Sequence, residues 1–210
     1  MVNAKQLLEY FGTLFGTEPR CELDYSTDLE LLVAIILSAQ CTDKRVNIVT
    51  KELFARCKGL DDYAIIDTAE LEKIIYSTGF YRNKAKNIKA MAQAVIEKHK
   101  RVIPNKIEEL STLPGVGRKT ASVFLCEYHK IPAIPVDTHV IRVANRLGLT
   151  KSCNPNIVER DLGKHFANSR DDWARLHLYI VLFGRYHCTA RNPKCERCEL
   201  RKICLTGGHI

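Results

Sequence analysis

Four cysteines close to the C-terminus constrain this chain more than any other feature of its sequence. Cys188, Cys195, Cys198 and Cys204 form a C-x6-C-x2-C-x5-C pattern within 17 residues. A segment this short cannot build a hydrophobic core, so the four thiolates predict a centre that holds the loop together. Iron–sulfur clusters and zinc ions both accept four thiolates, and the spacing alone does not separate them. A zinc ribbon usually has two separated C-x2-C knuckles, whereas this segment has one.

The remaining cysteines do not form a disulfide framework. The total of nine is odd, and the N-terminus lacks the long apolar stretch of a secretory signal. Cys57 and Cys126 lie inside helical patterns, where a lone cysteine is usually a small core residue. No apolar run approaches the roughly 20 residues that span a bilayer. We therefore expect a cytoplasmic protein.

The apolar pattern predicts an all-α fold. Apolar residues recur at helical spacing, and no segment shows the alternation of a strand. Six residues that favour helix N-termini stand ahead of such segments: Thr27, Asp67, Asn105, Asp137, Asn154 and Asp171. Helices are predicted over about 31–37, 46–57, 68–78, 88–99, 106–112, 118–128, 138–147, 155–166 and 172–183. Prolines at 132 and 135 mark a domain edge.

The chain carries a surplus of positive charge. Its formal net charge is +8, which suits a polyanionic partner and suits plain solubility equally well. Two clusters of basic residues are visible. Four follow one turn signal (Arg82, Lys84, Lys86 and Lys89), and six lie between Arg185 and Lys202.

A glycine-rich segment separates two short predicted helices. It reads Leu113-Pro114-Gly115-Val116-Gly117-Arg118-Lys119-Thr120-Ala121. Two glycines permit a tight turn that exposes backbone N–H groups at a helix N-terminus, where a phosphate oxygen binds well. The alternative is a plain turn between helices. The second glycine and the following Arg-Lys pair favour phosphate binding.

Two titratable residues stand at predicted helix starts, and each has a simple structural explanation. The helix dipole and Arg118 both disfavour an ammonium at Lys119, which favours the neutral amine that forms a Schiff base. Taken alone, such a lysine is more often a phosphate contact. Asp137, in Val136-Asp137-Thr138-His139, serves equally as an N-cap or as a carboxylate that stabilises a cationic sugar.

Taken together, these motifs resemble the endonuclease III family of base-excision DNA glycosylases. Five segments match in family order: residues 37–43 (Leu-Ser-Ala-Gln-Cys-Thr-Asp), 79–85 (Gly-Phe-Tyr-Arg-Asn-Lys-Ala), 113–121, 136–139 and the cysteine spacing. The likeness extends from about residue 25 to Cys204. It implies two helical domains with a DNA cleft between them. A six-helix domain would span 23–131 and contain a helix-hairpin-helix at about 106–129. Residues 1–22 and 132–210 would form the second domain, with a 4Fe–4S cluster on the cysteines of 188–204.

The resemblance also implies roles for individual residues. Lys119 would be the Schiff-base nucleophile and Asp137 the essential carboxylate. Gln40 and Phe80 would enter the duplex where the damaged nucleotide leaves it, although many relatives carry Leu at the position of Phe80. The implied DNA contacts are Gln40, Phe80, Gly115, Val116, Gly117, Arg118, Thr120, His139, Arg191 and Lys194.

The implied function is that of a bifunctional DNA glycosylase and abasic-site lyase. It would act as a monomer on double-stranded DNA that contains oxidised pyrimidines or abasic sites, and would nick the strand by β-elimination. A mismatch glycosylase of the same fold is less favoured, because such enzymes lack a lysine at the position of Lys119. A non-catalytic DNA-binding module would use Lys119 and Asp137 only as phosphate contact and helix cap. An electron carrier built on the cluster would not need so many helices ahead of the four cysteines.

Overall fold

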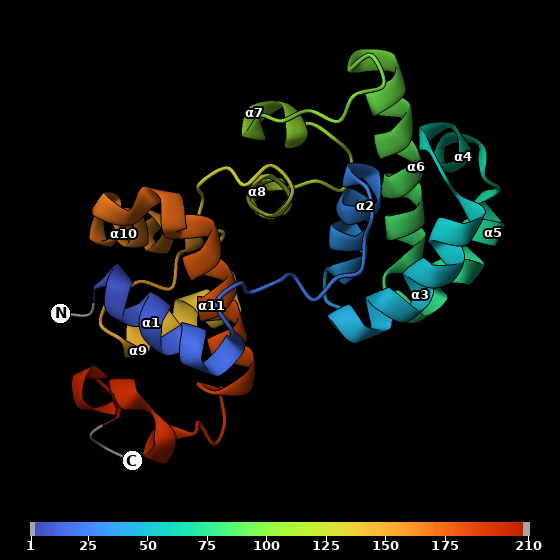
Figure 1. Ribbon diagram of the computed structural model, residues 1–210. Coiled ribbons are helices and arrows are strands. Elements are labelled where there is room, and N and C mark those ends of the chain that lie inside the picture. Colours follow the sequence, from blue (N-terminus) through green and yellow to red (C-terminus); the bar gives the residue numbers. More distant parts are fainter. Residues whose placement is uncertain (1–2, 208–210) are drawn as a thin grey trace. The chain divides into compact units, whose positions relative to one another are not determined.

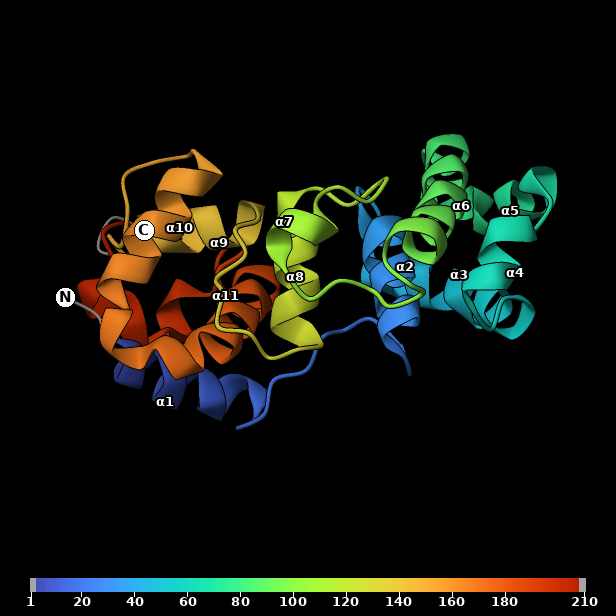
Figure 2. The same ribbon diagram turned by 90° about the horizontal axis from the view of Figure 1, so that it is seen from above.

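The protein is built from helices that fall into two compact units. The computed structural model describes residues 3–207, and within them it has eleven α-helices, four short 3-10 helices and no strand (Figures 1 and 2). The all-α prediction is confirmed. One unit, here called the hairpin unit, is Cys21–His129; the other, the cysteine-loop unit, combines Met1–Arg20 with Lys130–Ile210. None of the described helices combines the length and the apolar character needed to cross a bilayer.

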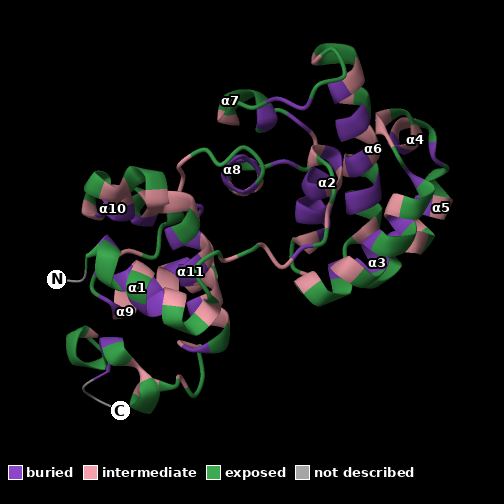
Figure 3. Ribbon diagram, viewed as in Figure 1, coloured by how far each residue is buried: buried purple, intermediate pink, exposed green. Residues whose placement is uncertain are grey.

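The hairpin unit is organised around a helix that is buried on almost every side. Its helices are α2 (Asp28–Ser38), α3 (Asp43–Arg56), α4 (Leu60–Ile65), α5 (Thr68–Ile75), α6 (Tyr81–Lys98), α7 (Ile107–Leu110) and α8 (Arg118–Glu127). Helix α2 packs against α3, α6 and α8, and all seven residues from Leu31 to Leu37 are buried (Figure 3). The continuous apolar run of this helix therefore reflects neighbours on every side.

Local capping explains where α2 begins. The Thr27 side chain accepts a hydrogen bond from the Glu30 amide at 3.1 Å, as the sequence predicts. The Glu30 carboxylate, however, accepts from the amide of Ser26 at 2.6 Å, one residue earlier than a capping box requires. Asp67 caps α5 in the same manner, through the Glu70 amide at 3.0 Å.

Two sequence predictions in this unit are wrong. Over Cys21–His129, all of which is described, the structure has seven α-helices and not six, because α4 has no counterpart among the predicted helices. A helix of six residues is too short to show a period, and α4 is held instead by Asp62, whose carboxylate accepts from the Gly59 amide at 3.1 Å. Asn105 is not an N-cap: Lys106 precedes α7 and no side chain caps that helix.

The cysteine-loop unit incorporates the N-terminal helix into its core. Its helices are α1 (Ala4–Phe15), α9 (Thr138–Arg146), α10 (Pro155–His165) and α11 (Trp173–Tyr186). Phe11 of α1 is fully buried, with ring centroids 4.7 Å from Phe183 and 6.0 Å from Tyr179. The Tyr179 hydroxyl donates to the Gly16 carbonyl at 2.6 Å. Asp171 was expected to open α11 but lies in the preceding 3-10 helix, Ala167–Asp172.

Candidate DNA-repair site and metal-binding loop

The turn between α7 and α8 has the geometry of an anion-binding hairpin. The Val116 amide donates to the Leu113 carbonyl at 3.0 Å, which closes the turn, and the Val116 side chain is buried. Gly117 is the N-cap of α8, so this helix begins without a side-chain cap. A helix start of this kind presents its first amides to an external acceptor such as a phosphate oxygen.

The two glycines of the turn have different reasons to be glycine. Gly115 has a φ of +78°, and a Cβ atom there would lie 2.8 Å from the Cβ of Asn87 on α6. Both the backbone conformation and the close approach of α6 therefore require glycine at 115. At Gly117 an added Cβ would meet nothing within 4 Å. Its lack of a side chain leaves the start of α8 open.

Lys119 lies in the first turn of α8, and its side chain is exposed, as is that of Arg118. Thr120 is half-buried. An exposed amine beside an uncapped helix start can contact an anion that binds to the first amides of the helix.

Asp137 is the N-cap of α9, as expected, and the cap uses one of its carboxylate oxygens. Oδ1 accepts from the Val140 amide at 2.8 Å, and the residue is half-buried. Within residues 3–207, Oδ2 has no hydrogen-bond partner. Capping and a second role are thus compatible, since the free oxygen can face a developing positive charge. Asp137 belongs to the cysteine-loop unit and Lys119 to the hairpin unit.

His139, in the first turn of α9, is packed into the protein. It is half-buried, and its Nδ1 lies 3.1 Å from Nη2 of Arg142. Burial lowers the pKa of His139, while the neighbouring Asp137 carboxylate opposes that shift. A Cβ at Gly184 would lie 2.8 Å from the His139 Cβ, so α11 passes close to this side chain. Its main contacts are therefore internal.

Gln40 and Phe80 are exposed and share an unusual backbone conformation. Gln40 has a φ of +54° and Phe80 a φ of +47°, in the left-handed region that side chains rarely adopt. Phe80 is 63% exposed, which is high for a residue of its size. These residues are held in strained conformations on the surface, where packing of their own side chains contributes little.

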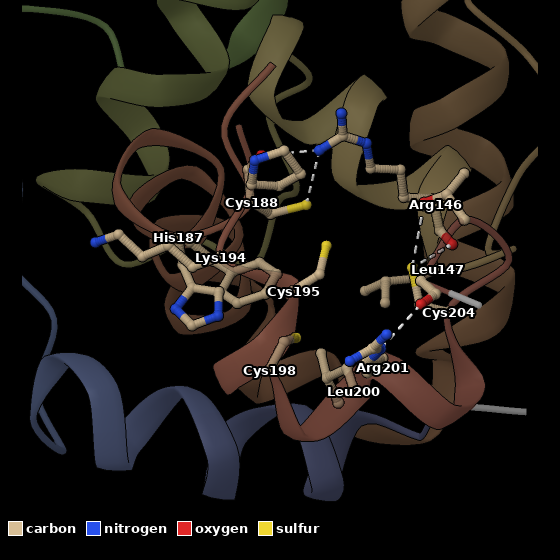
Figure 4. Close-up of a pocket in the computed structure, with 14 residues that line it drawn as sticks. Arg146, Leu147, His187, Cys188, Lys194, Cys195, Cys198, Leu200, Arg201 and Cys204 are labelled. Carbon is tan, nitrogen blue, oxygen red and sulfur yellow. Dashed lines mark hydrogen bonds between the residues drawn. The ribbon is translucent and has the colours of Figure 1, made fainter. Parts of the chain in front are cut away.

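The four C-terminal cysteines surround one pocket. Cys188 follows α11, and the other three belong to a loop with two 3-10 helices, Cys195–Arg197 and Glu199–Ile203. Figure 4 shows the four sulfur atoms around the pocket, and Leu147, Phe183 and Leu200 also line it. The four thiols are free and half-buried. Across residues 3–207, no three Cys, His, Asp or Glu side chains converge closely enough to hold a single metal ion.

Arg146, the last residue of α9, holds this loop and was not anticipated from the sequence. Its Nη1 donates to the Sγ of Cys188 at 3.2 Å and to the Thr189 carbonyl at 2.8 Å. The Arg146 carbonyl accepts from the Leu205 amide at 2.8 Å and from the Sγ of Cys204 at 3.3 Å, so one residue contacts both ends of the loop. Figure 4 shows the contacts of Arg146 with Cys188 and Cys204. The only hint in the sequence is a pair of arginines, Arg142 and Arg146, four residues apart on one helix.

Two basic residues of the loop face solvent. Arg191 and Lys194 are exposed, and the Lys194 amide donates to the His187 carbonyl at 3.0 Å.

Burial raises the pKa of the Cys198 thiol. A metal centre would have to displace that proton, because metals bind the thiolate, and both a zinc ion and an iron–sulfur cluster accept four thiolates.

Comparisons with known proteins give the same family from sequence and from structure. Residues 33–168 match the model for HhH-GPD superfamily base excision DNA repair proteins. Residues 188–204 match the model for the iron-sulfur binding domain of endonuclease III, which selects iron–sulfur over zinc. Endonuclease III of Synechocystis sp. is 49% identical over 88% of this chain and 84% of its own. That of Bacillus subtilis is 44% identical over 99% and 95%, respectively.

Solved structures extend the likeness to the whole fold. A trapped covalent intermediate of endonuclease III with DNA has a TM-score of 0.91 and 41% identity, over 99% of this chain and 98% of that one. A non-covalent complex of endonuclease III with DNA has the same scores. A thermostable thymine-DNA glycosylase has a TM-score of 0.82 at 22% identity, a likeness of fold alone.

The contacts of Arg146 generate a prediction about metal retention. Replacing Arg146 with Met keeps an unbranched apolar stem but removes the hydrogen bonds to Cys188 and Thr189. Partners of metal ligands typically contribute 10–100-fold to metal affinity, so we expect iron loss to a chelator to be faster by about tenfold or more. Arg197→Met, an exposed arginine of the same loop, is the matched control. Equal iron loss from both variants would contradict this role.

Proposed function

Because the chain belongs to the endonuclease III family of the HhH-GPD superfamily, we propose that Lys119 and Asp137 carry out its chemistry. The protein is a base-excision repair DNA glycosylase with abasic-site lyase activity, and it carries an iron–sulfur cluster. The observation that supports the assignment best is the exposed amine of Lys119 beside the uncapped start of α8. The relative trapped as a covalent intermediate with DNA supports a covalent route.

The reaction begins with the nucleotide outside the helix. A base within a duplex cannot be reached, and extruding it costs a few kcal/mol. Gln40 and Phe80, exposed on their loops, offset this cost by filling the gap in the stack. Arg118, Arg191 and Lys194 neutralise nearby phosphates, and the amides of Gly115 and Gly117 accommodate a phosphate at the hairpin.

Bond changes then take place at the sugar. The Lys119 amine bonds to the anomeric carbon as the glycosidic bond breaks, and the base leaves with the bonding electrons and takes up a proton. Asp137 stabilises the positive charge that develops on the sugar. The nitrogen then loses a proton, the bond between the anomeric carbon and the ring oxygen breaks, and the ring oxygen takes up a proton, which opens the sugar to an iminium. The iminium acidifies the adjacent sugar C–H, and loss of that proton expels the 3′-phosphate. Hydrolysis of the remaining imine releases the lysine.

The four cysteines are proposed as the ligands of the cluster. Cys188, Cys195, Cys198 and Cys204 line one pocket, and the match to the iron-sulfur binding domain spans all of them. The cluster itself would supply a covalent staple for a loop without a core of its own. The loop, once fixed in this way, would hold Arg191 and Lys194 in position to contact DNA.

We also propose a substrate class and a setting. Oxidised or ring-damaged pyrimidines are proposed as the lesions, with thymine glycol as the test substrate. The enzyme would act as a monomer, and the bacterial origin of its relatives points to work at the nucleoid in the cytoplasm. A duplex with a single abasic site tests the lyase step directly, and a non-catalytic DNA-binding module would leave it intact.

Replacing Cys198 with Ser tests the cluster ligands. The wild-type protein should contain about four iron and four sulfide ions per chain, and the variant should lose both together with its visible absorbance. DNA binding should weaken roughly tenfold, because Arg191 and Lys194 lose their fixed positions. Cys153→Ser, an exposed cysteine of the same unit, should change neither quantity. Full iron content in Cys198→Ser would remove Cys198 from the ligand set.

Replacing Lys119 with Gln tests the nucleophile. Borohydride should trap a protein–DNA adduct with the wild type and no measurable adduct with the variant, and nicking should be lost. DNA affinity should fall by less than about threefold, because only one exposed charge is removed. Lys98→Gln removes an exposed charge from the same unit and should leave the adduct intact. An adduct in Lys119→Gln would assign the nucleophile to another amine.

Replacing Asp137 with Asn separates its two roles. Asn caps helices about as well as Asp, so the stability should change by less than about 1 kcal/mol. Base release should slow by roughly 10²–10³-fold if the carboxylate stabilises a cationic sugar. Asp67→Asn is the matched control, since Asp67 caps α5 through the same kind of hydrogen bond. Similar activity in both variants would leave Asp137 with only its capping role.

A further inference from the structure

A buried lysine connects the two loops that carry Gln40 and Phe80. Lys84 lies on α6 and is only 5% exposed. Its Nζ donates to the Leu37 carbonyl at 2.8 Å and to the Thr78 carbonyl at 2.8 Å. In the described part of the chain, no carboxylate accompanies this ammonium group. A charge buried in this way persists only if its hydrogen bonds satisfy it.

The two carbonyl groups that it contacts come from helix ends. Leu37 belongs to the last turn of α2, where carbonyl groups lack intrahelical partners. Thr78 ends the 3-10 helix Tyr76–Thr78. A cation is favourable at the negative end of a helix dipole. Lys84 therefore caps two helix ends with a single nitrogen atom and fixes them to each other.

Each of these carbonyl groups belongs to a residue that precedes a strained residue closely in the sequence. Gln40 follows Leu37 by three residues, and Phe80 follows Thr78 by two. Both have positive φ values, and both side chains are exposed. Such conformations last only where the surroundings enforce them. Leu37 and Thr78 are buried, so the lysine connects the fixed ends from which both loops emerge.

We propose that Lys84 is a positioning residue for base extrusion. Its ammonium group sets the spacing between Gln40 and Phe80, so that both side chains enter the duplex together as the nucleotide leaves. This inference rests on the proposed insertion of Gln40 and Phe80. Burial also lowers the pKa of Lys84, which agrees with a site closed to solvent.

The test compares substrates that do and do not require extrusion from a paired stack. Lys84→Met keeps the buried stem and removes the donors. Release of thymine glycol from paired duplex, under single turnover, should slow about tenfold, while nicking of a preformed abasic site should change less than about twofold. Fluorescence of 2-aminopurine opposite the lesion should rise less than with the wild type. Lys84→Arg, which keeps donors, should restore most of the rate.

A second lysine on the same helix provides the matched control. The Nζ of Lys89 also donates to a backbone carbonyl, that of Ile66, but this carbonyl belongs to neither loop. Lys89→Met should lower the melting temperature as Lys84→Met does and slow both reactions equally. A parallel loss of both reactions in Lys84→Met would overturn the proposal, because it would indicate a purely structural role. If Lys84→Met does not fold, Lys84→Gln undergoes the same comparison.

A double-mutant cycle separates this proposal from the one on which it rests. In a Gln40→Ala/Phe80→Ala background, Lys84→Met should cost less than about a further twofold in base release, because the three residues act as one unit. Additive losses would overturn the role of Lys84. If Gln40→Ala and Phe80→Ala slow both substrates equally, insertion itself is wrong. If Gln40→Ala and Phe80→Ala slow release from the paired lesion more than nicking of the abasic site, and Lys84→Met slows both equally, only the positioning role of Lys84 is wrong.

Discussion

An α-helix leaves its first amides and its last carbonyl groups without partners, and the eleven α-helices within residues 3–207 have many such ends to satisfy. The residues that we propose to act in catalysis or positioning lie at those ends. The start of α8 has no side-chain cap, and Lys119 stands there. Asp137 caps α9 with one oxygen and keeps the other. Lys84 satisfies the end of α2. The capping of each end thus decides which groups face outward for binding and which are used internally.

Helix α9 shows how this arrangement joins two sites within one unit. Asp137 precedes its first residue and Arg146 is its last, over nine residues, or roughly 14 Å. The carboxylate and the anchor of the cysteine loop therefore lie at opposite ends of one rigid element. Gly184 lets α11 pass close to His139 on the same helix. The packing that orients α9 also orients the residues at both of its ends.

The features that the sequence predicted are local, and those that it did not are tertiary. Thr27, Asp67 and Asp137 act as caps, because a cap needs only its own next turn. The four cysteines indicated a metal centre by proximity, yet iron and zinc were separated only by the family match. In the sequence Lys84 is one of four basic residues that follow a turn signal, and nothing in that pattern indicates that its side chain is buried. Its partners, Leu37 and Thr78, are brought together by packing, which composition and spacing do not record.

The left-handed backbone at Gln40 and Phe80 has a consequence for how this protein can evolve. Glycine adopts that conformation without steric cost, so glycine at either position relieves strain of roughly 1 kcal/mol or more. The same replacement deletes a side chain and loosens the loop. With the proposed insertion of these side chains into the duplex, selection for heat resistance and selection for repair pull the two positions in opposite directions. A thermostable lineage has to find its extra stability elsewhere in the molecule and leave both positions strained.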